Sequence, residues 1–182
     1  MRIIILIILC VSLIACNNIS VSENKPMGNK FVDSAKIYDN WKTAKGESIE
    51  FKYPSDWRIK TKAVQGTTQF GLTFDPDTSD IFYPVEIWEF NASGGTFDDF
   101  SSAPHEYFKR MTGDKKASLM NQSKIQFKKF DAKKFEFNSE NYPVEITTIN
   151  GVKNYYMLVL YKEDKVDSIA NTIFNSIDIN SN

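Results

Sequence analysis

The residue types that could carry out catalysis come closest together between positions 98 and 105. His105 is the single histidine of the 182-residue chain, and Asp98 and Ser102 precede it. Their spacing puts the three side chains on one side of a helix, which suggests a Ser-His-Asp arrangement. Along a helix axis, however, Asp98 and His105 are about 10.5 Å apart, too far for a hydrogen bond. We therefore interpret this segment as an exposed helical face and expect that the protein is not an enzyme.

A short acidic segment is the candidate for metal binding. Asp75, Asp77 and Asp80 in "DPDTSD" offer oxygen ligands of the kind that calcium prefers. The segment lacks the central glycine and the closing glutamate of an EF-hand loop, so an Asp/Pro turn is the simpler interpretation. A zinc site would need more histidine or cysteine than the chain offers. The sequence thus predicts no metal site and no cofactor.

Two other patterns are candidates for contacts with a partner. In "KKFDAKKFEF" we expect the phenylalanines to face inward and the lysines outward on a solvated or edge strand, or to form a patch for anionic headgroups or an acidic protein; these lysines are Lys128, Lys129, Lys133 and Lys134. The pentapeptide "YPVEI" occurs twice, starting at Tyr83 and at Tyr142. If both strands lie at equivalent edges, these tyrosines are candidate partner contacts. The formal net charge of −1 gives no basic field, so no nucleic-acid partner is expected.

The N-terminus predicts export and a membrane anchor. Arg2 is followed by an apolar run, Ile3–Ala15, which suits a secretory signal but is shorter than the roughly 20 residues of a membrane-spanning helix. The sequence Leu13-Ile14-Ala15-Cys16 resembles the bacterial lipobox, in which the cysteine thiol receives a diacylglyceryl group and cleavage makes that cysteine the first residue. The resemblance implies a signal peptide at 1–15 and a lipidated Cys16. An ordinary signal peptide is the alternative.

The residues after the lipobox bear on location. Cys10 leaves with the leader, so the mature chain would contain no disulfide. Asn17 implies the periplasmic face of the outer membrane if the host has two membranes. Residues 16–34 are polar and lack helical or strand periodicity, so we expect the lipidated cysteine to be followed by a flexible tether. Residues 35–182 are then expected to form a single domain.

The domain is expected to be rich in strands, because it contains most of the 14 Phe and 8 Tyr. A segment that is apolar on both faces, "NYYMLVLYK", predicts a strand in the middle of a sheet. Thr96 and Asp99 predict a capping box at the start of a helix that ends at Gly113, and Asn150-Gly151 predicts a two-residue hairpin turn. Alternation predicts the remaining strands within 49–53, 57–60, 68–74, 83–90, 124–137 and 142–149. A 3.6-residue periodicity predicts a last helix within 165–179.

The resulting order, β-β-β-β-β-α-β-β-β-β-α, indicates an α+β fold with an antiparallel β-sheet flanked by helices. The turn "YPSDW" at Tyr53–Trp57 and the ending "IANTIFNSIDI" at Ile169–Ile179 resemble the PsbP-like superfamily, which includes DcrB-like envelope lipoproteins. In that family a [F/Y]-P-x-x-W turn follows the first core strand and a C-terminal helix closes the fold. The resemblance covers about residues 36–180. It implies protein binding without shared catalytic machinery.

Together these features predict a lipid-anchored cell-envelope protein that acts without catalysis as a protein-interaction, accessory or assembly factor. Its expected partners are the membrane, through the N-terminal lipid, and another envelope protein. The alternative is a carrier of a small ligand or metal ion with a pocket between sheet and helix. A concave aromatic cavity favours the carrier, and a flat exposed patch of Tyr, Phe and Lys favours the interaction factor.

Overall fold

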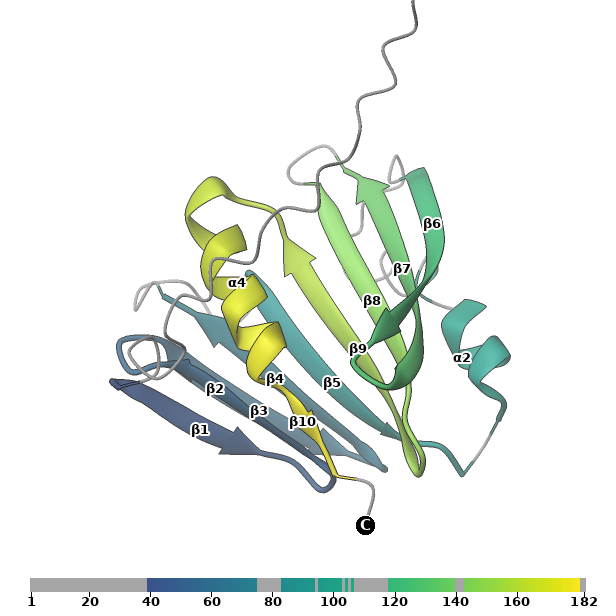
Figure 1. Cartoon of the computed structure of the whole chain (residues 1–182), viewed down its shortest axis with the longest axis horizontal. Helices are drawn as coiled ribbons and strands as arrows, with labels where there is room; N and C mark the ends of the chain where they lie inside the picture. Colours follow the sequence, from purple (N-terminus) through teal and green to yellow (C-terminus); the bar gives the residue numbers. More distant parts are fainter. Residues whose placement is uncertain are drawn as a thin grey trace, which may run out of the picture. The chain divides into compact units, whose positions relative to one another are not determined.

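A computed structural model of the chain describes residues 39–74, 83–93, 95–102, 104, 106, 118–139 and 143–180. These residues all belong to one compact unit, Asp33–Asn182 (Figure 1). Every strand pairing among the described residues is antiparallel. Among the described residues, neither helix has the length and apolarity needed to cross a membrane.

Two sheets make up the described part of the fold. The larger has seven strands in the order β3 (Arg58–Val64), β4 (Thr67–Thr73), β5 (Val85–Asn91), β9 (Asn154–Tyr161), β8 (Val144–Asn150), β7 (Phe130–Asn138) and β6 (Ser118–Phe127). The smaller has three, in the order β1 (Trp41–Lys45), β2 (Ile49–Pro54) and β10 (Asp178–Ile179). The helices are α2 (Phe97–Ser102) and α4 (Asp164–Ser176).

The larger sheet carries an apolar core on each of its two faces. Helix α4 and the smaller sheet cover one face, where the core includes Phe51, Phe70 and Ile173. The other face carries a second core around Phe135 and Ile146, against which Phe100 of α2 packs. Because successive residues of a strand point to opposite faces, a single strand can contribute apolar side chains to both cores.

Strand β9 lies at the centre of the larger sheet and serves both cores. Leu158 and Leu160 belong to the first core, whereas Met157 and Val159 belong to the second. All four side chains are at most 3% exposed. This confirms the prediction of a mid-sheet strand covered on both faces.

Helix α4 follows the predicted periodicity. Val166, Ala170 and Ile173 are fully buried, and Ile169 and Phe174 pack at the margin of the same core. The helix ends at Ser176, earlier than predicted, because Asp178 and Ile179 pair with Glu50 and Ile49 of β2. The expected element order is otherwise present. The sheet is less flanked by helices than expected, since the described part contains two helices and the smaller sheet supplies part of the cover.

The turns differ from the prediction. Three residues, Gly151–Lys153, join β8 to β9, so the predicted two-residue Asn-Gly turn is wrong. Gly151 is needed for another reason: a Cβ there would lie 2.5 Å from the Asn154 carbonyl oxygen. A two-residue turn instead joins β3 to β4, where Gln65 and Gly66 have φ values of 44° and 77°. Positive φ at both positions is typical of a type I′ turn.

Candidate binding groove

Helix α2 begins with the capping box that the sequence predicts. The Asp99 N–H donates to Thr96 Oγ1 (3.2 Å), and the Thr96 N–H donates to Asp99 Oδ2 (3.2 Å). The Thr96 hydroxyl also donates to Asp99 Oδ2 at 2.7 Å. These hydrogen bonds favour the charged carboxylate, so they lower the pKa of Asp99 from its ordinary value. Reciprocal bonds of this kind satisfy N–H groups that the first turn leaves open.

Aromatic rings hold α2 against the second core. The Phe100 ring centre lies 4.9 Å from that of Phe90 and 5.2 Å from that of Tyr155. The Phe97 ring lies 5.7 Å from Tyr155. The Tyr155 hydroxyl in turn donates to the Gly95 carbonyl at 2.8 Å, just before the helix. The start of the helix is therefore fixed to β5 and β9 by both apolar and polar contacts.

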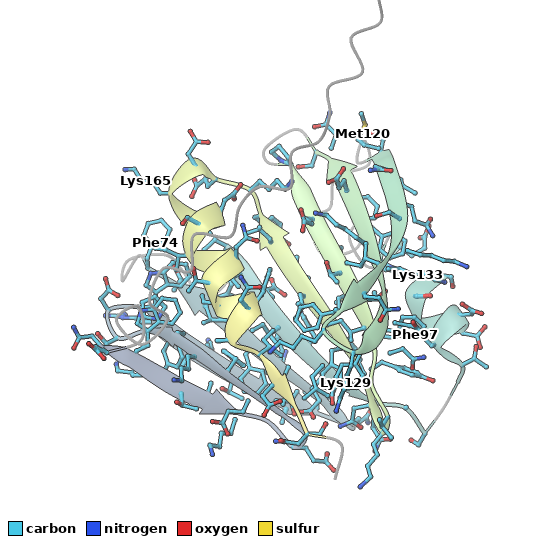
Figure 2. The ribbon with its side chains drawn as sticks, in the orientation of Figure 1. Phe74, Phe97, Met120, Lys129, Lys133 and Lys165 are labelled. Carbon is cyan, nitrogen blue, oxygen red and sulfur yellow. The ribbon has the colours of Figure 1, made fainter. Side chains whose placement is uncertain are left out.

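Lys133 of β7 makes the polar attachment of α2 to the sheet (Figure 2). Its ammonium group donates to Ser101 Oγ at 2.7 Å, pairs with Asp98 Oδ1 at 3.0 Å, and lies 5.7 Å from the centre of the Phe97 ring. The Lys133 side chain is only 18% exposed, whereas that of Asp98 is 87% exposed. Lys133 therefore acts inside the domain rather than as a free surface cation.

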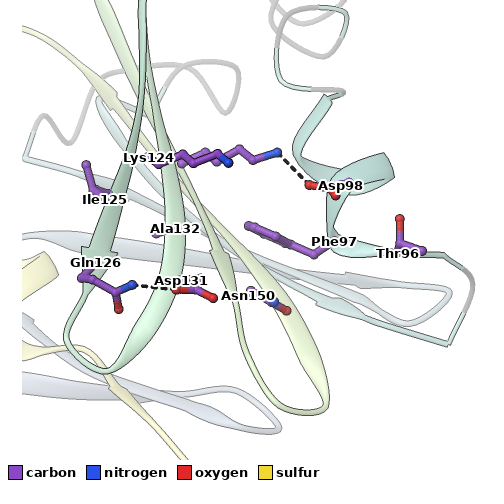
Figure 3. Close-up of a pocket in the computed structure, with 10 residues that line it drawn as sticks. Thr96, Phe97, Asp98, Lys124, Ile125, Gln126, Asp131, Ala132 and Asn150 are labelled. Carbon is purple, nitrogen blue, oxygen red and sulfur yellow. Dashed lines mark hydrogen bonds and ion pairs between the residues drawn. The ribbon is translucent and has the colours of Figure 1, made fainter.

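A groove lies between the start of α2 and the β6–β7 hairpin (Figure 3). It encloses about 670 Å³. On its walls Gln126 Nε2 donates to Asp131 Oδ1 at 2.6 Å, and Lys133 pairs with Asp98. The groove thus presents charges of both signs together with amide groups and a comparable apolar surface. Its lining residues are Thr96, Phe97, Asp98, Lys124, Ile125, Gln126, Asp131, Ala132, Lys133 and Asn150.

The four lysines selected from the sequence do not form one patch. Lys133 and Lys134 are neighbours on β7 and point to opposite faces. Lys134 pairs with Glu145 (2.8 Å) and Glu136 (3.8 Å) on the face away from α2. Strand β7 is also not an edge strand, because β6 lies outside it.

The other two lysines, Lys128 and Lys129, form the two-residue turn between β6 and β7. Lys128 has a φ of 55°, and its ammonium group donates to the Ile177 carbonyl. Lys129 is exposed, and its ammonium lies 5.3 Å from the centre of the Phe130 ring. This turn separates Lys128 and Lys129 from the two lysines of β7, and of these four lysines only Lys133 lines the groove.

The two "YPVEI" segments start strands on either side of β9, not at the edges. The Pro84 carbonyl accepts a hydrogen bond from the Tyr161 N–H (3.0 Å), and the Pro143 carbonyl accepts one from the Lys162 N–H (2.8 Å). Tyr83 is half-buried, and its ring covers Gly71, where a Cβ would lie 2.5 Å from the ring. Part of the Tyr83 ring is therefore buried against the protein's own sheet.

Several predicted residues lie outside the described residues: Cys16, Asp75, Asp77, Asp80, His105 and Tyr142. Of the residues around His105, Asp98 pairs with Lys133, and the Ser102 hydroxyl donates to the Asp99 carbonyl at 2.7 Å. Within the part of the chain that the structure describes, no three His, Cys, Asp or Glu side chains are grouped so that they could hold a metal ion.

Sequence reasoning missed a buried polar cluster around Glu89, which is 3% exposed. Its carboxylate accepts hydrogen bonds from the Ser48 N–H (2.7 Å), the Glu47 N–H (2.8 Å) and the Ser48 hydroxyl (2.6 Å) of the β1–β2 loop. Asn154 Nδ2 donates at 3.0 Å, and the Tyr156 hydroxyl lies 2.6 Å from Ser48 Oγ. Burial raises the pKa of Tyr156 above its ordinary value.

A signal for this cluster is present in the sequence. Val85, Ile87 and Glu89 occupy alternate positions of β5, so Glu89 points toward the same core as the two apolar residues. A buried carboxylate needs hydrogen-bond donors around it. The inward position of Glu89 therefore predicts a structural or functional role for this residue.

The comparisons with known proteins concern the fold. No family model matches the chain, and no curated protein matches it in sequence. The solution structure of cyanobacterial PsbP (CyanoP) from Synechocystis is similar over 77% of this chain and 92% of that chain, with 14% identity and a TM-score of 0.54. A protein from Bacteroides thetaiotaomicron is 13% identical over 78% of this chain and 48% of its own, with a TM-score of 0.38. A protein of unknown function from Pseudomonas aeruginosa is 9% identical over 69% and 85%, with a TM-score of 0.35.

The likeness to CyanoP shows that the described domain has a PsbP-like fold, which confirms the fold that the sequence resemblance implied. A shared fold does not by itself assign a function.

Proposed function

We propose that this protein is held on a bacterial membrane by a lipidated Cys16 and acts, without catalysis, by binding another protein of the cell envelope. The observation that carries this proposal is the groove between α2 and the β6–β7 hairpin, which encloses about 670 Å³ and presents charges of both signs. In a host with two membranes, we expect the anchor to lie at the periplasmic face of the outer membrane. The protein then serves as an interaction or assembly factor.

The setting of the charged groups supports binding rather than proton transfer. Carboxylates that act as general acids usually lie in apolar pockets. Asp98 is instead 87% exposed and already paired with Lys133, which also donates to Ser101. Such groups are arranged to hold the helix and to present hydrogen-bonding partners at a surface.

The surroundings of the groove support a protein partner. Strand β6, which forms one wall, carries Leu119 and Met120 with 41% and 68% of their surfaces exposed. Figure 2 shows Met120 and Lys129 at opposite ends of the β6–β7 hairpin. Exposed apolar side chains beside polar and charged groups are typical of a protein-interaction surface.

A second candidate is the carrier of a small ligand, for which the groove volume is the favourable observation. Small-molecule sites usually enclose about 300–1,000 Å³ and place a few polar groups around an apolar surface. The groove lies between a helix and the sheet, as this alternative requires, and Phe97 supplies an aromatic wall.

The test is in-cell crosslinking of the tagged full-length protein followed by mass spectrometry. We compare the wild type with Cys16→Ala, with Asp131→Lys in the groove, and with Asp39→Lys, an exposed site before β1 that serves as the matched control. We expect one specific protein to be captured by the wild type and the Asp39→Lys variant. Its yield should fall about tenfold in the other two variants.

Diffuse crosslinks that are the same in all four proteins would contradict the proposal. A small molecule from cell extract that raises the melting temperature of the wild type but not of Asp131→Lys would favour the carrier instead.

A further inference from the structure

The two edges of the larger sheet differ sharply in charge. Strand β3, at one edge, carries Arg58, Lys60 and Lys62 within seven residues. Strand β6, at the other edge, has ten residues and one charged side chain, Lys124. Natural proteins place charges, especially lysine, on an edge strand to prevent pairing with other chains. By this criterion β3 is protected and β6 is not.

The backbone of β6 offers a regular template. Within the described residues, β6 pairs only with β7, so its outer edge has no strand partner there (Figure 1). Its register is irregular between Leu119 and Asn121 but continuous from Asn121 to Phe127. This segment is about 23 Å long at 3.3 Å per residue. It is long enough to receive a strand of ordinary length.

Lys124 gives this edge a preference for an acidic partner. It is exposed and makes no ion pair with any other described residue. The register places it opposite Lys133, whose charge is compensated by Asp98. An incoming carboxylate beside Lys124 gains an opposite-charge pair between neighbouring strands, which stabilises a sheet.

The groove can also bind side chains of the partner. Lys124 and Gln126 both line the groove and come from the edge strand itself. The side chains of an added strand alternate between two faces, so every second one would continue this wall. Main-chain hydrogen bonds then provide affinity, and the groove provides specificity.

A second copy of this chain fits the edge poorly. Antiparallel pairing of Asn121–Phe127 with the same segment of another copy sets Lys124 opposite Lys124, because Lys124 is the middle residue. Like charges directly opposite each other destabilise a strand pair. A different segment with an acidic residue at this point has no such cost.

We propose that β6 accepts an extended segment of the envelope partner as an added strand, with an Asp or Glu of that segment beside Lys124. This inference rests on the proposed function and specifies how the partner binds.

The test uses the full-length, membrane-anchored protein with the photoreactive residue p-benzoylphenylalanine at Gln122 of β6 or, as a control, at Thr61 of β3. The crosslinked peptide is identified by mass spectrometry. We expect crosslinking from Gln122 to one partner segment that contains Asp or Glu, with a yield at least tenfold above that from Thr61. Lys124→Glu should lower this yield about tenfold, and exchanging the partner's acidic residue for Lys should restore it. Lys62→Glu on β3 should have no effect.

Lys124→Glu is expected to fold normally, because the new carboxylate faces Lys133 across the β6–β7 pair. Lys124→Gln provides a second variant, and a thermal melt of each checks the fold. In the complex, exchange should slow at least tenfold for those amides of residues 121–127 whose N–H groups point away from β7.

Three outcomes overturn the inference while leaving the proposed function intact. These are capture of the partner with equal yield from β3 and β6, capture that Lys124→Glu leaves unchanged, and capture only from positions away from β6. Crosslinking of β6 to a second copy of this chain would also overturn it. If no partner is captured from any position, the proposed function fails together with the inference.

Discussion

The buried carboxylate of Glu89 links the two sheets at the scale of a single residue. It extends from β5 of the larger sheet to the backbone N–H groups of Glu47 and Ser48 in the loop of the smaller one. The loop approaches so closely that a Cβ at Gly46 would collide with the carboxylate and lie 2.8 Å from Ile49 Cγ2. With the Glu89 carboxylate in this position, only glycine fits at position 46.

Replacing Glu89 with Gln tests this link. The amide keeps the size of the side chain, but its NH₂ group would face a donating N–H or hydroxyl group where an oxygen now accepts. We expect the free energy of unfolding to fall by about 1–3 kcal/mol, the usual cost of leaving a buried polar group without a partner. Urea unfolding measures it, with Glu47→Gln at an exposed position as the control. A loss below about 0.5 kcal/mol, the range of a neutral surface change, would contradict the role of Glu89.

Helix α2 shows how an element depends on its neighbours. With six residues it is too short to be stable alone, so packing and the Lys133 contacts must hold it. The ion pair with the exposed Asp98 contributes little, because water screens it. The larger effect comes from the hydrogen bond to Ser101, which is 1% exposed. The polar attachment of this groove wall to β7 therefore depends on Lys133.

Lys133→Ala should loosen this wall without unfolding the domain. We expect a loss of about 1–2 kcal/mol in local stability, since the Ser101 hydroxyl loses its 2.7 Å partner. Hydrogen exchange of the amides in 97–102 should then become about tenfold faster. Lys134→Ala is the matched control, because Lys134 pairs with Glu145 on the opposite face. Equal exchange in both variants would show that Lys133 does not hold α2.

Local patterns predicted the elements, and non-local pairing determined their neighbours. The Thr96–Asp99 capping box and the buried face of α4 follow from residues close together in sequence, and both were predicted correctly. The places of the two "YPVEI" strands beside β9 depend on pairing partners far along the chain. The turn at Gly151 was mispredicted because packing against Asn154 and Tyr156, rather than backbone preference, determines it.

The same limit applies to the site at the scale of the whole molecule. Strand alternation predicts that Lys133 and Lys134 point to opposite faces of the sheet, but it does not predict which of these faces α2 covers. Lys133 was therefore selected without its partners, and Lys124 was not selected at all. The groove exists only because α2, β6, β7 and the end of β8 meet after folding. The PsbP-like fold was predicted because its motifs are local, whereas the groove has no local motif.

The central claim is that this domain binds its partner while Cys16 holds it on a membrane. The most direct measurement is the mass of the mature N-terminal peptide of the full-length protein isolated from bacterial membranes. The account predicts a chain that begins at Cys16 and carries a diacylglyceryl group, with at least two acyl chains for stable anchoring. It also predicts that Cys16→Ala yields a protein without lipid. A mature chain that begins at another residue, or an unmodified Cys16, would contradict the account.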